Sequence, residues 1–407
     1  MFVIISASRS DIMDKYEDII DDIYPNLGSE KNQGIRKDMN IYEILTLISP
    51  GTELRIALDE MLRAEMGALI VFGTNIVLDS IIRGGLKLDT EMHSSTLFEL
   101  SKMDGAIILS NDLKRIVYAN AHLTPDRNVE SKETGIRHRS GEQTAKQTGL
   151  PVVAISKRRN VISLYYHKER YVLHDLPYLT TKADHYLKMI SNYRSQITGL
   201  LNELTYYELN NNSTYDDAIK VILKMLYLEK AKIDLDCLII ELGSEGSQIR
   251  QALFENTVGL KAELISLFRD YSTETESPEE LIEKLYPDSK EIFDKITIAK
   301  VLGIPEEKIG EVVKVKGYRL LSKIPKLNKT TIEKVINAEE NFFNIYSTSK
   351  EELSDKAKIS DKQADLIKEQ INKIYDMIVN KIYKIWTLDR TNLCINFTCW
   401  LCIGLTH

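Results

Sequence analysis

The sequence predicts a multidomain protein of the α/β plus all-α class, with a mixed α/β domain around a central sheet ahead of helical domains. Helix and strand patterns alternate over residues 40–170, whereas residues 178–290 carry almost no strand pattern. Residues 291–384 are again helical but more basic. A chain of 407 residues is long enough for two or three domains with cores of their own. The expected parts are an N-terminal extension, the α/β domain, a helical spine, a second helical domain and an atypical tail, at residues 1–38, 39–177, 178–290, 291–384 and 385–407.

The composition excludes several classes of protein. Hydrophobic residues make up 43% and charged residues 28% of the chain, which is typical of a globular rather than a disordered protein. The formal net charge of −7 argues against a wholly basic nucleic-acid coat but leaves room for a local basic patch. Three of the four cysteines lie beyond residue 390, so no disulfide framework is expected.

No membrane-spanning helix or secretory signal is expected. No apolar run reaches the roughly 18 residues that cross a bilayer. The apolar run Phe2–Ile5 is too short for a signal peptide and has no basic flank. Together with the cysteine pattern, these features predict a cytoplasmic protein with no membrane partner.

Apolar spacing predicts the first half of the α/β domain. Glycines bound the apolar run Gly67–Gly73, which is typical of a buried strand. Helical apolar spacing predicts helices at residues 41–48, at about residues 53–64, and one that ends over residues 97–103.

Two strand pairs and a helix are predicted in the second half of this domain. A helix over Ser140–Gln147 ends at Gly149, because glycine just past the last turn is a common stop signal. Short polar or basic turns separate the strands of each pair. The pairs are Ala106–Leu109 with Ile116–Ala119, across Ser110-Asn111-Asp112, and Val152–Ser156 with Val161–Tyr166, across Lys157–Asn160.

The middle of the chain is predicted to be an all-helical spine. Its long segments carry the apolar spacing of amphipathic helices. These segments are Ala183–Leu204, Tyr215–Lys230, Leu235–Leu242 and Ser247–Arg269.

Beyond the spine, the pattern of a helix–hairpin–helix is present. Leu320–Leu327 places a tight turn between two apolar helical runs. Such a hairpin offers backbone amides to a nucleic-acid phosphate and positions a duplex without reading its sequence. The cationic candidates for DNA contacts are Lys316, Arg319, Lys323, Lys326, Lys329 and Lys358.

Asp104-Gly105 stands immediately before the predicted strand Ala106–Leu109. A carboxylate beside a residue without a side chain can hold a hydrated Mg²⁺ or Mn²⁺ while a ribose approaches the backbone. Asp-Gly is also a common turn before a strand, and taken alone the residues favour that turn. Asp104 is still the best candidate in the chain for a metal ligand.

Arg137-His138-Arg139 lies at the start of the predicted helix Ser140–Gln147. Two guanidiniums can make paired hydrogen bonds to phosphate oxygens, and a helix N-terminus adds partial positive charge. A solvated basic surface with Glu142 as counter-ion explains the same residues equally well. The turn Lys157-Arg158-Arg159 offers either a third cationic contact or a solvated tip. No Walker-type or Rossmann glycine pattern is visible, so a phosphate site here rests on arginine, histidine and helix amides.

The segment Phe98–Ser110 and the motif Arg137-His138-Arg139-Ser140 together resemble the diadenylate cyclase domain. Over about residues 40–384, the order of domains resembles the DNA-integrity scanning diadenylate cyclases of bacteria. The resemblance implies that two ATP molecules condense to cyclic di-AMP and two pyrophosphates, with Mg²⁺ or Mn²⁺ as cofactor. It also implies a homo-octamer in which cyclase domains face each other, and branched double-stranded DNA as a partner that lowers cyclase output.

The same resemblance implies a role for each matched residue. Asp104 holds the metal and helps activate the ribose 3′-hydroxyl, and Leu123 helps place the adenine. The implied catalytic residues are Asp104, Arg137, His138 and Arg139. The implied ATP contacts are Gly105, Leu123, Ile136, Arg137, His138, Arg139, Ser140 and Ser156.

The chain departs from the family pattern at two functional positions. Ile136 stands where the family usually has threonine, which removes a side-chain hydroxyl contact and leaves a backbone contact. The second hairpin, Lys356–Asp361, lacks the glycines expected there, which favours weaker DNA binding or binding through lysines.

Two other functions remain open on the sequence. One is a non-enzymatic DNA-binding scaffold whose cyclase domain only senses nucleotide. The other is an ATP-hydrolysing enzyme that releases orthophosphate instead of pyrophosphate. The joint presence of both motifs favours the cyclase.

Overall fold

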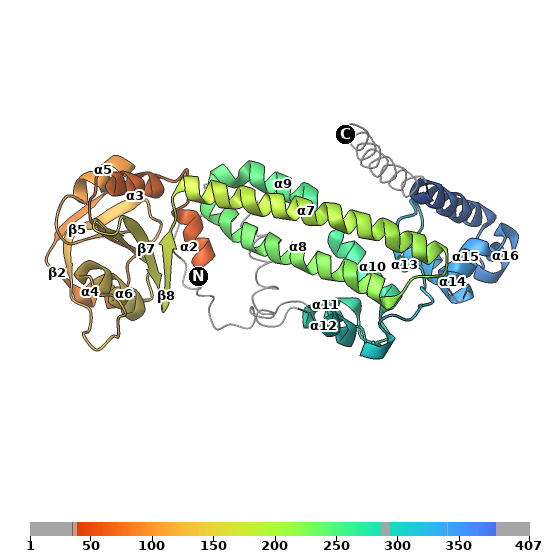
Figure 1. Ribbon diagram of the computed structural model, residues 1–407. Coiled ribbons are helices and arrows are strands. Elements are labelled where there is room, and N and C mark those ends of the chain that lie inside the picture. The colour runs from red at the N-terminus through yellow and green to blue at the C-terminus, as the bar shows by residue number, and fades with distance from the viewer. Residues whose placement is uncertain (1–34, 36–38, 286–293, 340, 380–407) are drawn as a thin grey trace, which may run out of the picture. The chain divides into compact units, whose positions relative to one another are not determined.

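The computed structural model describes residues 35, 39–285, 294–339 and 341–379. These residues form two compact units (Figure 1). Among the described residues, the sheet unit comprises residues 35, 39–189 and 231–255, and the helical unit comprises residues 190–230, 256–285, 294–339 and 341–379. The predicted tail lies outside the described residues, as does the predicted N-terminal extension apart from Ile35. The backbone N–H of Ile35 donates to the carbonyl of Asn111 at 2.6 Å.

The sheet unit is built on a mixed eight-stranded sheet of order β2-β5-β4-β1-β6-β7-β8, with β3 paired to β5. The central strands β1, β4, β6 and β7 are short and apolar, and almost every side chain in them is buried. Only β1 and β4 are parallel neighbours; the other paired strands are antiparallel. The strands are β1 (Leu69–Phe72), β2 (Ile82–Arg83), β3 (Leu86–Glu91), β4 (Ala106–Leu109), β5 (Arg115–Leu123), β6 (Val152–Ser156), β7 (Val161–Tyr166) and β8 (Glu169–Leu173).

Helices cover both faces of this sheet, with α3 and α5 on one side and α4 and α6 on the other (Figure 1). Polar side chains start several of them, because a side-chain oxygen can accept from the unpaired N–H groups of a first turn. Asn40 caps the first helix and forms a capping box with Glu43, and Thr52 and Asn75 cap the next two. These helices are α2 (Ile41–Leu47), α3 (Glu53–Arg63), α4 (Ile76–Ile81), α5 (Ser94–Leu100) and α6 (Ile136–Thr148).

The predicted strands of this unit are confirmed, and those at β4, β6 and β7 have the predicted bounds. The fifth strand is longer than predicted, and β2, β3, β8 and α4 were not predicted. Strand β3 has the sequence LKLDTE and is largely exposed on the sheet, so it lacks the apolar run that marks a buried strand.

The helical unit and the long helices that enter it contain no strand among the described residues apart from an isolated bridge between Thr214 and Val312. The predicted segments Tyr215–Lys230 and Leu235–Leu242 are one continuous helix, whereas Ser247–Arg269 is broken at Gly259, whose φ is +79°. The predicted α/β plus all-α class is confirmed. The long helices are α7 (Leu176–Leu209), α8 (Tyr215–Leu242), α9 (Ser247–Thr257) and α10 (Leu260–Tyr271), followed by α11 (Pro278–Lys284) and α12 (Lys295–Val301).

Two helical hairpins close the described part of the chain. The first joins α13 (Tyr318–Leu321) to α14 (Lys329–Ala338), and α15 (Phe342–Ser347) follows it. The second joins α16 (Lys350–Ala357) to a helix over residues 361–379. Each turn contains a lysine in the left-handed region, Lys326 at φ +67° and Lys358 at φ +52°. Glycine adopts this conformation without strain, so lysine here costs some stability.

Both hairpins pack around one apolar core, whose buried members come from every helix of the pair. Among the described residues, no helix is both long and apolar enough to cross a membrane. The core includes Leu320, Leu321, Ile324, Ile332, Val335, Phe342, Ile345, Leu353, Ile359, Ala364 and Ile367.

Candidate active site

The register of β1 and β4 brings Gly67 and the predicted site residue Asp104 to one edge of the sheet. The two strands are parallel, and Ile70 lies opposite Ile107. Gly67 and Asp104 each precede the paired residue by three positions, so both precede their strands at the same end of the sheet. Asp104 is exposed at this edge.

The strands on either side end at the same edge. Strand β5 runs antiparallel to β4 with Ala121 opposite Ala106, and β6 runs antiparallel to β1 with Ala154 opposite Leu69. Leu123 and Ser156 are the last residues of these two strands. The predicted contacts Leu123 and Ser156 therefore lie at the edge that carries Asp104.

Gly105 can only be glycine in this arrangement. Its φ is +97°, and an added Cβ would lie 2.8 Å from the backbone carbon of Asn120. Asn120 is itself left-handed, at φ +54°, where the pairing of β4 with β5 shifts register. The backbone at Gly105 is thus close-packed on one side and carries no side chain to obstruct a ligand on the other.

The donor set at Asp104 fits a magnesium or manganese ion held jointly with a nucleotide. No group of three or more His, Cys, Asp or Glu side chains gathers within the described residues. Mg²⁺ commonly binds through one or two carboxylates, with the remaining positions taken by phosphates and water. A single exposed carboxylate meets that requirement only when phosphates are present.

The helix that carries the Arg-His-Arg motif begins at Ile136, so the predicted start at Ser140 was wrong. Gly135 precedes the helix and supplies no side-chain cap. Arg137 and His138 therefore lie in the first turn, where N–H groups have no intrahelical acceptor and can bind an anion. The N–H of Arg139 already donates to the carbonyl of Gly135 at 2.8 Å. Ile136 leaves 90% of its surface exposed, and Ser140 lies in the next turn.

Arg137 reaches the same sheet edge. An added Cβ on Gly67 would overlap a guanidinium nitrogen of Arg137. The guanidinium thus packs directly over Gly67, two residues before β1. Strand β1 is the neighbour of β4, which Asp104 precedes by two residues. The structure brings the two halves of the predicted site together through this contact, which spacing alone did not reveal.

His138 is buried beneath the motif rather than exposed beside the arginines. Its Nδ1 lies 2.9 Å from the hydroxyl oxygen of Tyr165, and that hydroxyl donates to Oε1 of Glu133 at 3.0 Å. Burial lowers the pKa of His138, although the nearby Glu133 carboxylate opposes this effect. His138 is therefore neutral at pH 7, and the positive charge of the motif comes from the arginines.

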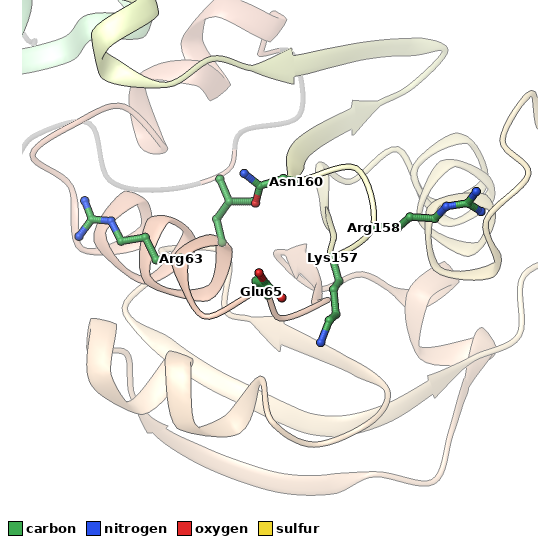
Figure 2. Close-up of a pocket in the computed structure, with 6 residues that line it drawn as sticks. Arg63, Glu65, Lys157, Arg158 and Asn160 are labelled. Carbon is green, nitrogen blue, oxygen red and sulfur yellow. The ribbon is translucent and has the colours of Figure 1, made fainter.

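An open pocket of 730 Å³ lies beside this edge. Arg63 and Glu65 at the end of α3 line it, together with Lys157, Arg158 and Asn160 of the turn after β6. Figure 2 shows that the guanidinium groups of Arg63 and Arg158 point in opposite directions, away from the other labelled residues. The turn is held by Ser156, whose hydroxyl accepts from the N–H of Arg159 at 3.2 Å. Cations outnumber carboxylates in the lining, which favours an anionic ligand.

Sequence reasoning missed several residues around the site. Gly67 was taken only as the boundary of a strand, and Arg63 only as part of a helix. Glu133 and Arg170 were not predicted, because no motif or spacing links them to residues 137–139. Only the folded chain brings these residues together.

The predicted DNA contacts divide into exposed and buried residues. The prediction that Arg319 contacts DNA was wrong, because its side chain is 0% exposed and ion-paired to Glu208 and Glu263. Its N–H and those of Gly317 and Tyr318 donate to the carboxylate of Asp270 at 2.7–2.9 Å. The remaining candidates are exposed: Lys316, Lys323, Lys326, Lys329 and Lys358.

Comparison with known proteins gives two family matches. A family described as "DisA bacterial checkpoint controller nucleotide-binding" matches residues 55–170. A second, described as "DisA bacterial checkpoint controller linker region", matches residues 173–309. The first match contains every predicted ATP contact, and the second covers the predicted spine.

Curated relatives match most of the chain. The DNA integrity scanning protein DisA of Clostridioides difficile is 38% identical over 343 residues, which cover 84% of this chain and 96% of the relative. The protein of the same name from Acetivibrio thermocellus is 36% identical, with 84% and 96% covered. That of Bacillus subtilis is 34% identical, with 85% and 97% covered.

Proposed function

Because the chain belongs to the DisA family of DNA integrity scanning proteins, we propose that it is a diadenylate cyclase whose output responds to DNA structure. The resemblance predicted from the two motifs is confirmed by relatives that are 34–38% identical. The observation that carries the proposal is the convergence of Asp104, Gly105 and Arg137 at one sheet edge within the nucleotide-binding domain.

The proposed reaction joins two ATP molecules. Each ribose 3′-oxygen loses its proton and forms a bond to the α-phosphorus of the other ATP. Each α-phosphorus breaks its bond to the bridging oxygen, and two pyrophosphates leave. Such in-line displacement needs positioning and charge neutralisation more than a covalent nucleophile.

The chain's residues supply these two requirements from opposite sides of the nucleotide. Arg137, Arg139 and the open first turn of α6 hold the phosphates, where cations and helix amides favour negative charge. Gly105 lets the ribose approach the backbone, and Leu123 and Ser156 border the nucleotide from the neighbouring strands. Asp104 helps activate the 3′-hydroxyl, either by accepting its proton or by holding the metal ion beside it. A bound Mg²⁺ or Mn²⁺ at Asp104 supplies further neutralisation of phosphate charge.

One protomer cannot complete this reaction alone. Its site holds one ATP, and the 3′-hydroxyl of that ATP needs the α-phosphate of a second. The active form is therefore a homo-oligomer in which two sites face each other, and the family resemblance implies an octamer. A stable and active monomer contradicts this part of the proposal.

The decisive assay incubates the full chain with ATP and Mn²⁺ and identifies products by mass spectrometry. One cyclic di-AMP and two pyrophosphates for every two ATP consumed support the proposal. ADP with orthophosphate indicates a hydrolase instead. The Asp104→Asn variant should lose turnover and keep part of its ATP binding, whereas full activity in this variant removes Asp104 from its role.

The DNA arm of the proposal rests on the exposed lysines of the two hairpins. Backbone amides and lysines at helical hairpins bind phosphates and leave the base sequence unread. Anisotropy titrations with a four-way junction and a matched linear duplex test this arm. Tighter junction binding that also lowers cyclic di-AMP output supports coupling; tight binding with no turnover favours a scaffold.

A further inference from the structure

A group of buried side chains beside the nucleotide site has no part in the mechanism above. Glu133 precedes α6, and only 6% of its surface is exposed. Its carboxylate accepts from the hydroxyl of Tyr165, a fully buried residue of β7. The same hydroxyl oxygen contacts Nδ1 of His138. One phenol thus connects a buried carboxylate to the central residue of the Arg-His-Arg motif.

The hydrogen bonds along this connection determine which ring nitrogen of His138 carries the proton. A carboxylate only accepts, so the single hydroxyl proton of Tyr165 points to Glu133. The Tyr165 oxygen is then the acceptor for His138, whose Nδ1 has to carry the N–H. Burial raises the pKa of Tyr165 and lowers that of His138, so both groups keep these states at pH 7.

This tautomer limits what the His138 side chain can bind. Its Nε2 carries a lone pair and is buried without a hydrogen-bond partner among the described residues. Phosphate oxygens are acceptors as well, so Nε2 cannot hydrogen-bond to them. The side chain therefore contributes to anion binding by fixing the first turn of α6 against β7.

Glu133 also gathers the cations around this turn. Its carboxylate lies 3.0 Å from a guanidinium nitrogen of Arg170 and 3.6 Å from one of Arg159. Its backbone carbonyl accepts from Nε of Arg139 at 3.4 Å. One glutamate thereby links α6, β7, β8 and the turn after β6.

We propose that Glu133 and Tyr165 are positioning residues of the nucleotide site, which hold His138 and the first turn of α6 in the orientation that Arg137 and Arg139 need. The inference rests on the proposed cyclase function. Neither residue touches the substrate in this scheme. Tyr165 acts through His138, and Glu133 acts through Tyr165 and through its contact with Arg139.

The chain provides a matched control on the other face of the sheet. The hydroxyl of Tyr171 on β8 donates to Oε2 of Glu241 at 2.7 Å, and Nδ1 of His174 lies 3.1 Å from the same oxygen. Glu241 is 1% exposed. Tyr171 follows Arg170 along β8, and successive side chains of a strand point to opposite faces. Tyr171→Phe therefore removes a similar hydrogen bond to a buried glutamate, away from the motif.

The test compares Tyr165→Phe, Tyr171→Phe and wild type as full-length oligomers with ATP and Mn²⁺. Tyr165→Phe should lower kcat roughly tenfold or more, because misplaced phosphates leave the in-line geometry. Its KM should change less than about threefold, because the arginines still bind ATP. Tyr171→Phe should keep kcat within about twofold of wild type and lose a similar amount of thermal stability.

An unchanged kcat in Tyr165→Phe overturns the positioning role, and so does an equal loss of kcat in both variants. Failure of the wild type to make cyclic di-AMP overturns the proposed function itself. The assay of the wild type alone shows this, so the two failures can be told apart. If Tyr165→Phe does not fold, Glu133→Gln tests the same proposal. Its amide can donate as well as accept, so the proton order is no longer fixed, and kcat should fall at least about threefold. Wild-type kcat in Glu133→Gln overturns the proposal.

Discussion

Two helices of this protein begin with the same local pattern but differ in whether carboxylates of the chain contact their first residues. Gly135-Ile136-Arg137 starts α6, and Gly317-Tyr318-Arg319 starts α13. In α13 the carboxylate of Asp270 accepts from the first N–H groups, and Glu208 and Glu263 neutralise the arginine. In the described chain, no side chain caps the start of α6.

A helix start with glycine and, two residues later, arginine therefore favours an anion, but the local sequence does not say where that anion comes from. At α13 the chain supplies its own carboxylates, and the result is a buried joint. At α6 the anion has to come from outside, and the result is a ligand site. Four experiments test this difference between the two helix starts.

The largest effect is expected for Arg319→Met. This change leaves Glu208 buried and unpaired, which typically costs about 3–5 kcal/mol of unfolding free energy. Urea denaturation of the full chain measures the loss. The matched change Arg137→Met should alter stability by less than about 1 kcal/mol, because that arginine is only partly buried. Equal losses in the two variants remove the distinction.

The second effect is a pH dependence of the helical unit. Burial raises the pKa of Asp270 from 3.8 to about 7, against the pull of its amide donors and Arg319. A carboxyl group with a raised folded pKa stabilises fully below its unfolded pKa, and this contribution is lost as the pH rises through the folded value. Stability should therefore decline between about pH 4 and 7. Asp270→Asn should flatten this decline in denaturation measured at several pH values; an unaltered profile assigns it to other groups.

The third effect concerns the open helix. Gly67→Ala places a methyl group where the guanidinium of Arg137 now lies, so the arginine has to move. ATP affinity, measured by calorimetry with a non-hydrolysable analogue, should fall about tenfold, or 1.4 kcal/mol. Gly199→Ala is the control, since an added Cβ there meets nothing within 4 Å. Undiminished affinity in Gly67→Ala shows that Arg137 binds phosphate from another position.

The smallest effect is expected at the exposed cations of the hairpins. Lys326→Gln should lower the slope of log affinity against log salt for junction DNA by about 1, as one phosphate contact is lost. Lys300→Gln, an exposed lysine of α12 outside the hairpins, should leave the slope unchanged. If Lys326→Gln behaves like this control, the first hairpin does not face the DNA.

Much of the sheet unit was predictable because its central strands are buried on both faces. Continuous apolar runs mark β1, β4, β6 and β7, and the turn and stop residues around them set their ends. The edge strand β3 was not predictable, since its exposed side chains carry no apolar pattern. Within the site, the Asp104 and Arg137–Arg139 motifs were visible in the sequence, whereas Gly67 and Glu133 were not.

The class of fold, the family and the two motifs can be predicted from the amino-acid sequence, because they depend on residue types at fixed local spacing. Which arginines remain available to bind a ligand depends on the tertiary packing. Arg319 and Arg137 occupy the same position in two similar helix starts, but the carboxylates around Arg319 lie 49 to 111 residues earlier in the chain and reach it only in the folded protein. Glu208 and Glu263 form ion pairs with Arg319, whereas no carboxylate forms one with Arg137 among the residues that the structure describes. A charge acts on whatever lies within a few ångströms, and that neighbourhood is set by packing rather than by position along the chain.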